Sequence, residues 1–262
     1  MDKQKIYRSN CNGNSFTLIF KDEIKMDINA SSIPYICDYE KQGKDDGLLI
    51  VDRFDSKHDF SIEYYNNDGT WETLCANGTL CAISLLLSLN HPFHHLTLRA
   101  GDGIHKIKFE GSTIFLGMKR PVFKTEEIEI HSHIGRQVNS GAKHFVTNST
   151  INNTNELYNI AQKIRYHETF QPSGTNVNFL RIKHSNKISV ITYEKGIEKI
   201  MLSCGSGSVA AAFYAFHINN IKSPLKIVNQ GGEMLLIFNP SWDSVWFSSN
   251  PVLDKQSEIN CR

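Results

Sequence analysis

The chain has 262 residues and a formal net charge of +1, with 21% charged and 40% hydrophobic residues. This length suits one large domain or two of roughly 130 residues, each able to bury a core. The balanced charge, without a basic block, argues against nucleic acid or an anionic membrane surface as a partner. The N-terminal sequence lacks the apolar core of a signal peptide, and the longest apolar run, Cys81 to Leu89, is about half of a membrane span. We therefore expect a soluble, cytoplasmic protein.

The first series of predicted elements runs from Gly47 to Met118. The apolar segment "GLLIVD" and an alternating strand that ends at Tyr65 and Asn66 precede a loop to Cys75. Alternation with a period of two indicates half-buried strands. An apolar helix is predicted over Thr79 to Leu89, and the hairpin sequence "LTLRAGDGIHKIKFEGSTIFLGM" follows it.

The same series recurs in the second half of the chain. Strand sequences in "TNVNFLRIKHSNKISVITYEKGIEKIMLS" lead to Cys204, and Tyr193 and Glu194 stand where the first series has Tyr65 and Asn66. A second apolar helix is predicted over Ser208 to Ile218, followed by the hairpin "SPLKIVNQGGEMLLIF". A repeat of this kind indicates two halves of like topology.

These elements predict an α/β fold of the mixed α+β kind. Both helices are apolar nearly all round, so each must be covered on most sides, for instance by a curled, mostly antiparallel or mixed sheet. We expect two pseudo-symmetric halves, residues 1–119 with Cys75 and residues 120–262 with Cys204; about 251–262 is a candidate for packing back on the first half. The active site is expected in the cleft between the halves.

The chain has six cysteines, without a CxxC pair, and is too long to need a disulfide framework, so we expect thiols. A free cysteine is ordinarily a small buried hydrophobic residue. That interpretation suits four of them, Cys11, Cys37, Cys81 and Cys261. It suits Cys75 and Cys204 less well, because each precedes a glycine-containing turn and an apolar helix.

A cysteine before a helix N-terminus suggests acid–base chemistry. Helix N-termini attract carboxylates and stabilise thiolates. Asn77 and Ser206 are favoured N-cap residue types, and Gly78, Gly205 and Gly207 would let a ligand approach the backbone. If two such termini shared one carboxylate, one thiolate could remove the α-proton while the other thiol protonated the opposite face. This inversion needs no cofactor, and the chain has neither a GxGxxG nor a Walker loop. The alternative is a pair of ordinary turns with buried cysteines.

The motifs "CANGTLC" and "CGSGSVAA", with "NGNSF", "YNNDG", "GTNVNF" and "YEKG", resemble the diaminopimelate epimerase family of pyridoxal-phosphate-independent amino-acid epimerases over nearly the full chain. The resemblance implies pseudo-symmetric halves, each a sheet around a central helix. It also implies a small-molecule amino-acid substrate, closure around that substrate, no cofactor and a homodimer.

The resemblance also implies roles for individual residues. Cys75 and Cys204 would form the acid–base pair, Glu194 would bind the α-ammonium beside Cys204, and His144 would lie near Cys75 and tune it. The substrate would further be bound by Asn14, Asn66, Asn176 and Lys195, and by the backbone of Ala76, Asn77, Gly78, Gly205 and Ser206. Alternatively, His144 is an ordinary edge-strand histidine and the asparagines are turn residues. The histidine-rich stretches "HPFHH" and "HSH" lack an HExxH pattern, so we expect solvated loops and no metal.

The chain departs from the family pattern mainly toward the end of the site that would hold the non-reacting part of the substrate. Ala76 replaces a glycine, Ala142 and Lys143 replace Asn-Pro, and Lys195 replaces an arginine that grips the distal carboxylate. Lysine keeps the charge but loses the bidentate fork. Two smaller changes are Leu80 for arginine, and Ile200 and Met201 for Glu-Thr.

Three functions stay open besides epimerisation of diaminopimelate from the LL to the meso form on the route to lysine and peptidoglycan. The altered distal end allows a racemase or epimerase of a different amino acid. The chain could instead be a binding protein that kept the fold and lost the chemistry. It could also be a redox protein that pairs Cys75 and Cys204 as a disulfide.

Overall fold

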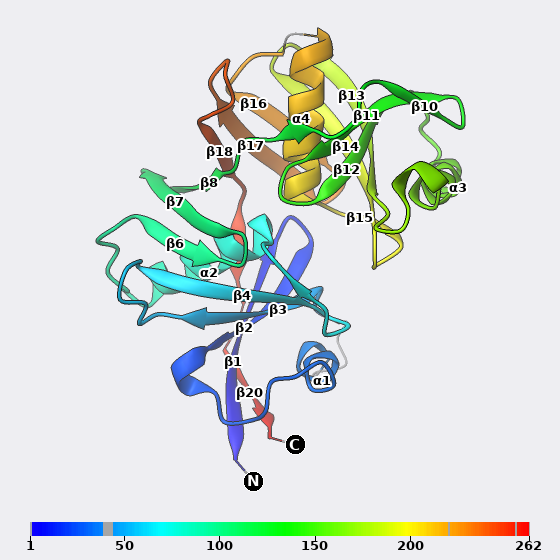
Figure 1. Cartoon of the computed structure of the whole chain (residues 1–262). Coiled ribbons are helices and arrows are strands. Elements are labelled where there is room, and N and C mark those ends of the chain that lie inside the picture. Colours follow the sequence, from blue (N-terminus) through cyan, green and yellow to red (C-terminus); the bar gives the residue numbers. More distant parts are fainter. Residues whose placement is uncertain (1, 39–43, 220, 255, 262) are drawn as a thin grey trace. The chain divides into compact units, whose positions relative to one another are not determined.

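The computed structural model describes residues 2–38, 44–219, 221–254 and 256–261. The chain divides into two compact units: unit 1 comprises residues 1–117 and 248–262, and unit 2 comprises residues 118–247. The mixed α/β fold expected from the sequence is confirmed, and strands predominate in both units (Figure 1).

In its described residues, unit 1 contains ten strands and two helices. Its strands are β1 (Lys3–Cys11), β2 (Asn14–Phe20), β3 (Gly47–Asp52), β4 (Phe60–Asn66), β5 (Trp71–Glu72), β6 (Thr97–Ala100), β7 (Gly103–Glu110), β8 (Thr113–Met118, whose last residue enters unit 2), β19 (Pro251–Leu253) and β20 (Ser257–Asn260). Its helices are α1 (Ile33–Cys37) and α2 (Ala76–Ser88). A 3-10 turn, η1, spans Lys21–Glu23.

Unit 2 has a comparable set of elements. Its strands are β9 (Val122–Phe123), β10 (Ile128–Ile130), β11 (His133–Asn139), β12 (Lys143–Asn148), β13 (Asn176–His184), β14 (Lys187–Glu194), β15 (Lys199–Met201), β16 (Leu225–Asn229), β17 (Gly232–Phe238) and β18 (Val245–Ser248, whose last residue belongs to unit 1). Its helices are α3 (Thr154–Arg165) and α4 (Gly205–Asn219), with the 3-10 turn η2 (Glu168–Phe170).

The two units share one strand topology. In unit 1, β1 pairs antiparallel with β2, β2 parallel with β3, β3 antiparallel with β4, and β4 with both β5 (antiparallel) and β6 (parallel). In unit 2, β11, β12, β13, β14, β15 and β16 repeat the same pairings in the same order. A hairpin closes each series, β6–β7 in one unit and β16–β17 in the other.

Each unit covers one apolar helix with its strands. Helix α2 packs against β1, β2, β3 and β19, and helix α4 packs against β11, β12, β13, β14 and β16 (Figure 1). Leu80, Cys81, Ala82 and Ile83 are completely buried in α2, as are Val209 to Ala212 in α4. A helix without a polar face is stable in water only when it is covered on most sides, which explains why the strands curl around it.

Both helices begin three residues before the predicted start. The carbonyl oxygen of Cys75 accepts the Thr79 N–H at 2.8 Å, and that of Cys204 accepts the Ser208 N–H at 2.9 Å. The cysteines, rather than Asn77 and Ser206, therefore stand at the N-cap positions. The prediction was wrong because glycine and asparagine suggest a turn, whereas burial of the following segment extends the helix through them.

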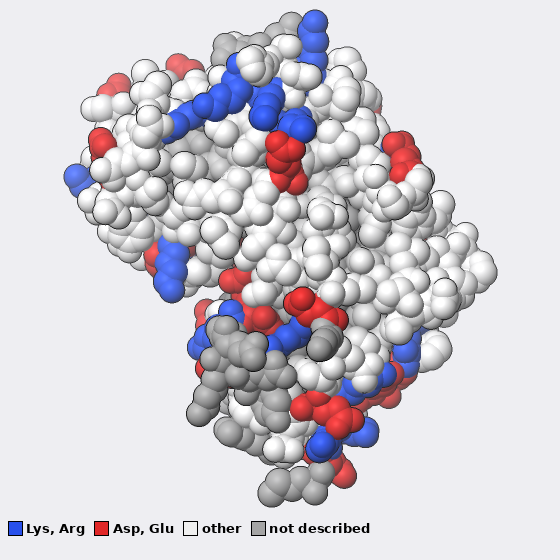
Figure 2. Space-filling view, turned by 180° about the vertical axis from the view of Figure 1, so that it is seen from behind, with Lys and Arg blue, Asp and Glu red and all other residues white. Residues whose placement is uncertain are grey.

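Charged side chains on the face shown in Figure 2 occur in small groups separated by uncharged residues, with a basic group near the top of unit 2. In this unit Lys187 and Lys226 both approach Glu233, at 3.7 and 2.8 Å. In the part of the chain that the structure describes, no helix combines the length and apolarity needed to cross a bilayer.

Candidate functional site

Unit 1 places Cys75 at the N-terminus of the buried helix α2. The first helical turn is formed by Ala76, Asn77 and Gly78, all of them buried. Cys75 itself is half-buried. N–H groups of a first helical turn have no carbonyl partner four residues back within the helix, so they can bind an anion beside the sulfur. Ala76 lies in the helix, so its methyl group in place of glycine causes no backbone strain.

Asn14 approaches Cys75 from the first residue of β2. Its Oδ1 atom lies 4.0 Å from Cys75 Sγ and 3.4 Å from Asn77 Nδ2. Its Nδ2 atom donates to Asp46 Oδ2 at 2.6 Å. The structure thus brings together five of the predicted residues of this half-site, Asn14, Cys75, Ala76, Asn77 and Gly78, and adds Asp46. Asp46 was not among the predicted site residues, because a hydrogen bond between side chains 32 positions apart leaves no pattern in the sequence.

Asn66 lies at the end of β4, and its side chain is held by neighbouring residues. Its Oδ1 accepts from the Tyr64 hydroxyl at 2.9 Å and its Nδ2 donates to Thr70 Oγ1 at 3.1 Å. These are the local bonds of a turn, and they leave its predicted role in substrate binding as a proposal.

Unit 2 places Cys204 directly before helix α4, where the residue is only 8% exposed. Its Sγ accepts the Gly207 N–H at 3.4 Å and lies 3.6 Å from Ser206 Oγ. Burial raises the pKa of the Cys204 thiol to about 12, and the negative charge of Glu194 contributes in the same direction. The helix N-terminus was expected to stabilise a thiolate here. Its N–H groups do lower the pKa of this thiol, but burial outweighs them, so Cys204 is a thiol at neutral pH.

His144 lies in the same unit as Cys204 and connects to it through Ser206. Its Nε2 is 3.0 Å from Ser206 Oγ, and its Nδ1 is 2.8 Å from Asn178 Oδ1. Asn178 Nδ2 donates to Thr192 Oγ1 at 2.7 Å, which turns the amide oxygen toward the ring. We therefore assign the proton of the neutral imidazole to Nδ1, and Nε2 accepts from the Ser206 hydroxyl.

The alternative interpretation of His144 as an edge-strand residue is wrong. Strand β12 pairs with β11 on one side and β13 on the other, and His144 is completely buried. Its expected position near Cys75 stays a prediction. Both of its ring nitrogens are hydrogen-bonded to residues of unit 2, Asn178 and Ser206. The sequence could not reveal this, because Ser206 and Asn178 lie far along the chain.

Asn176 and Lys195 belong to another polar group of unit 2, separate from the one around Cys204. Asn176 Oδ1 accepts the Lys195 N–H at 2.8 Å, and its Nδ2 donates to the Lys143 carbonyl at 3.1 Å. The ammonium groups of Lys143 and Lys195 both reach Ser173, at its Oγ (3.1 Å) and its carbonyl oxygen (3.2 Å). Two exposed cations thus meet at one residue. Lys143 was noticed in the sequence only as a departure from the family pattern.

Of the two histidine-rich stretches, residues 91–95 lie in a loop as predicted, whereas His131 and Ser132 form a turn and His133 is the first residue of β11. The Asp59 carboxylate accepts the N–H groups of His94, His95 and Thr97, and His94 and His95 are exposed. Among the described residues, no group of three or more His, Cys, Asp or Glu side chains is arranged to hold a metal ion.

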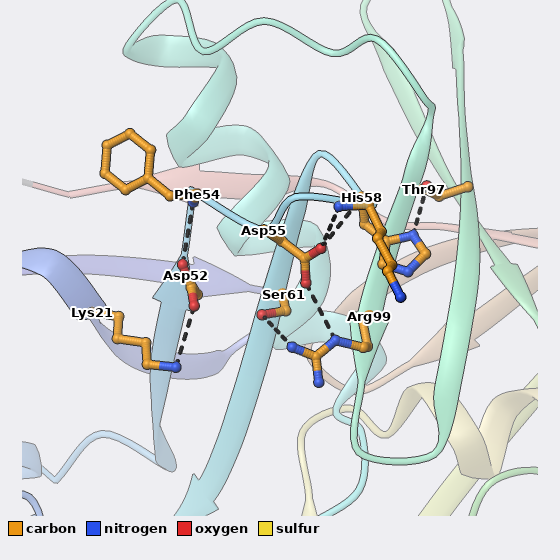
Figure 3. Close-up of polar contacts among 9 residues, drawn as sticks. Lys21, Asp52, Phe54, Asp55, His58, Ser61, Thr97 and Arg99 are labelled. Atoms are coloured by element: carbon orange, nitrogen blue, oxygen red, sulfur yellow. Dashed lines mark hydrogen bonds and ion pairs between the residues drawn. The ribbon is translucent and has the colours of Figure 1, made fainter.

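A separate polar cavity of about 270 Å³ lies in unit 1, lined by residues that include Lys21, Ser61 and Arg99. Figure 3 shows that its cations already have partners. Lys21 binds Asp52 at 3.2 Å, and Arg99 Nε binds Asp55 at 3.2 Å. None of the predicted site residues lines this cavity, so we do not regard it as the candidate site.

Burial of His144 predicts a loss of stability in acid. Burial lowers the pKa of His144 to about 4. As the pH falls from about 6.5 to about 4, the unfolded chain binds a proton at this residue that the folded chain does not bind, so the free energy of unfolding decreases. The full effect is about 3 kcal/mol.

Urea unfolding of the wild type and of His144→Gln, measured at several values between pH 7 and pH 4, tests this expectation. The variant should show a shallower decrease in the free energy of unfolding, since its amide does not titrate. Equal slopes for the two proteins would contradict the assignment, because other groups that titrate in this range are common to both.

No family model matches the chain. It is 32% identical over 238 residues to a diaminopimelate epimerase of Flavobacterium psychrophilum, which covers 90% of this chain and 91% of the relative. Among solved structures, a predicted epimerase from Pseudomonas aeruginosa superposes with a TM-score of 0.72 at 12% identity, covering 98% of this chain and 99% of the other. A hydroxyproline epimerase from Agrobacterium vitis gives a TM-score of 0.70 at 13% identity, with coverages of 98% and 92%. The two structures show a shared fold.

Proposed function

The chain belongs to the diaminopimelate epimerase family and is an isomerase, and on this premise we propose that it interconverts LL- and meso-diaminopimelate with Cys75 and Cys204 as its acid–base pair. The observation that supports this most directly is the repeated placement of a cysteine at the N-cap of a buried helix, once in each unit. Each sulfur has polar neighbours: Cys75 Sγ lies beside Asn14 Oδ1, and Cys204 Sγ lies beside the Gly207 N–H and Ser206 Oγ.

In the proposed reaction the two sulfurs act on opposite faces of the α-carbon. The thiolate of Cys75 takes the α-proton, and the electron pair left on carbon is delocalised into the α-carboxylate. The Cys204 thiol then delivers its proton to the other face, which inverts the centre and leaves Cys204 as the thiolate. The reverse reaction exchanges the two roles, so the number of protons on the enzyme and substrate together is unchanged.

The surroundings of Cys204 suit the donor role in this direction. Its raised pKa, about 12, keeps the proton on sulfur until the carbanion forms. The Gly207 N–H is positioned to stabilise the thiolate that remains. His144 is neutral and supports Ser206, so we assign it a positioning role beside Cys204.

The α-carboxylate would bind the first-turn N–H groups of both helices, those of Ala76 to Gly78 and of Gly205 and Ser206. Donors fixed in the folded protein stabilise the developing enolate without reorganising, and this is commonly the largest contribution to such catalysis. Glu194, at the end of β14, carries the charge needed for the α-ammonium. Asn14, Asn66 and Asn176 complete the proposed substrate contacts.

Diaminopimelate is favoured as the substrate because two cations lie at the group formed by Lys143, Ser173 and Lys195. We assign this pair to the distal carboxylate in place of a single arginine. The second candidate, epimerisation of a single-headed amino acid, is favoured by the loss of the arginine fork itself.

Incubation of the purified protein in deuterium oxide distinguishes the two candidates. LL-diaminopimelate should exchange its α-proton for deuterium and appear as the meso form, as followed by NMR. A panel of single-headed amino acids, including proline and hydroxyproline, should exchange slowly or not at all. Exchange confined to the single-headed substrates would eliminate diaminopimelate as the substrate.

Removal of both ammonium groups should weaken binding of diaminopimelate. For the double variant Lys143→Ala/Lys195→Ala we expect KM to rise by about 10- to 100-fold with kcat nearly unchanged, since hydrogen bonds to a charged group are worth about 1.5–3 kcal/mol. Lys187→Ala, which removes a lysine paired with Glu233, is the matched control. An unchanged KM in the double variant would show that the distal carboxylate binds elsewhere.

A further inference from the structure

Asp46 directs the amide group of Asn14, a residue of the proposed site. Asp46 lies in the loop that leads into β3, and its Oδ2 accepts two hydrogen bonds, from Asn14 Nδ2 at 2.6 Å and from the Ser15 N–H at 2.9 Å. The oxygen of an amide carries no hydrogen to donate to a carboxylate, so the amide of Asn14 must turn its nitrogen toward Asp46. This contact fixes the one rotation of the amide that would otherwise exchange its donor and its acceptor.

The opposite end of the same amide therefore presents an oxygen to the helix. Asn14 Oδ1 lies 3.4 Å from Asn77 Nδ2 and 4.0 Å from Cys75 Sγ. Asn14 is 8% exposed and Asn77 is 1% exposed, so bulk water competes little for these bonds. An oxygen that faces the sulfur can only accept, and a hydrogen bond of this kind favours the thiol over the thiolate.

We propose that Asp46 is a positioning residue that, through Asn14, keeps an acceptor facing Cys75 and so stabilises its protonated form. The functional importance of this inference rests on the proposed two-cysteine reaction. The reaction passes a proton between two sulfurs and must run in both directions, so the two thiols need comparable affinities for that proton. Burial and Glu194 favour the thiol at Cys204, and Asp46 and Asn14 provide a matching preference at Cys75.

Other ionisable groups near this half-site have different partners. Cys11 is the last residue of β1, and its Sγ lies 3.9 Å from Asn77 Oδ1. Cys81, a buried residue of α2, lies beside Cys11. Asp45, the neighbour of Asp46, accepts instead from Thr17 Oγ1 at 2.6 Å and lies 3.3 Å from Arg8 Nε. Asp45 is therefore a suitable control: it is a hydrogen-bonded carboxylate of the same loop, but its side chain bonds Thr17 and Arg8 instead of Asn14.

The test measures how the reactivity of Cys75 depends on pH in the full chain without substrate. Iodoacetamide labelling is quantified by mass spectrometry with fragment ions that separate Cys75 from Cys81. In Asp46→Asn the amide of Asn14 is free to rotate and donate to the sulfur, and the midpoint of Cys75 labelling should fall by roughly one pH unit. Asp45→Asn should leave this midpoint in place.

A double-mutant cycle separates positioning from a direct effect of the charge. If Asp46 acts through Asn14, Asp46→Asn should add almost nothing to the shift produced by Asn14→Ala alone. The inference is overturned if Asp46→Asn leaves the midpoint unchanged, or if it produces its full shift in the Asn14→Ala background. A purely structural role would lower the unfolding midpoint in urea without moving the labelling midpoint.

Should Asp46→Asn not fold, Asp46→Ser replaces it, because the hydroxyl oxygen can still accept the Ser15 N–H. Labelling needs no substrate, so its outcome is independent of the proposed function. A shifted midpoint in a protein that does not epimerise diaminopimelate would contradict the proposed substrate and leave the role of Asp46 standing. In an active enzyme, the acidic limb of the pH profile of kcat/KM should move in the same direction as the labelling midpoint.

Discussion

Alanine at either Cys75 or Cys204 is expected to reduce epimerisation of diaminopimelate by at least about 10³-fold, because in the proposed reaction each variant lacks the group that carries the proton on one face of the α-carbon. The measurement is deuterium incorporation at the α-carbon together with conversion between the LL and meso forms. Binding of the substrate should change little, since the proposed carboxylate ligands are backbone N–H groups that alanine leaves in place.

Cys261→Ser is the control for these two variants. Cys261 is a half-buried free thiol at the end of the chain, and it should be replaced without loss of activity. Turnover that persists in Cys75→Ala or Cys204→Ala would exclude a mechanism with two sulfurs. Loss of substrate binding along with turnover would instead indicate that the cysteine supports the structure of the first helical turn.

Gly207→Ala should impair both stability and catalysis, although alanine is normally the better helix former. A Cβ atom at this position would lie 2.4 Å from Asn178 Nδ2, 2.9 Å from Thr192 Oγ1 and 3.3 Å from Cys204 Sγ. Asn178 cannot move aside freely, since it is hydrogen-bonded to His144 and Thr192. Overpacking of this kind costs about 1–3 kcal/mol, against a gain of up to about 1 kcal/mol in helix propensity.

The net expectation for Gly207→Ala is a loss of about 1–2 kcal/mol in the free energy of unfolding and of at least about tenfold in kcat. Chemical unfolding and steady-state kinetics measure the two quantities. Gly111→Ala is the control, because no atom would approach its Cβ within 4 Å and its cost arises from the backbone angle alone. A Gly207→Ala enzyme with normal kcat would show that Asn178 and its neighbours can shift without disturbing Cys204.

The repeated series of strands, loop, cysteine and helix was predictable because each element has a local pattern. Alternation of apolar residues indicated the strands β4 and β14, and the uninterrupted apolar segments after Cys75 and Cys204 indicated the buried helices. The starts of these helices were not predictable in the same way. Glycine and asparagine have low intrinsic helix propensity, and only the packing of α2 and α4 beneath their strands makes the helical conformation of those residues favourable.

The amino-acid sequence by itself determined the mixed α/β fold and the internal repeat that places a cysteine before each buried helix, since periodicity and motif spacing are properties of neighbouring positions. The other proposed site residues came from the resemblance to a family. Only the tertiary structure decided the protonation of Cys204, the connection of His144 to Ser206, and the contact of Asp46 with Asn14. Burial and hydrogen-bond partners depend on segments 32 to 62 positions apart in the chain being folded together, and no local pattern encodes them. The chemistry of each cysteine is therefore set by side chains that the strands bring to it.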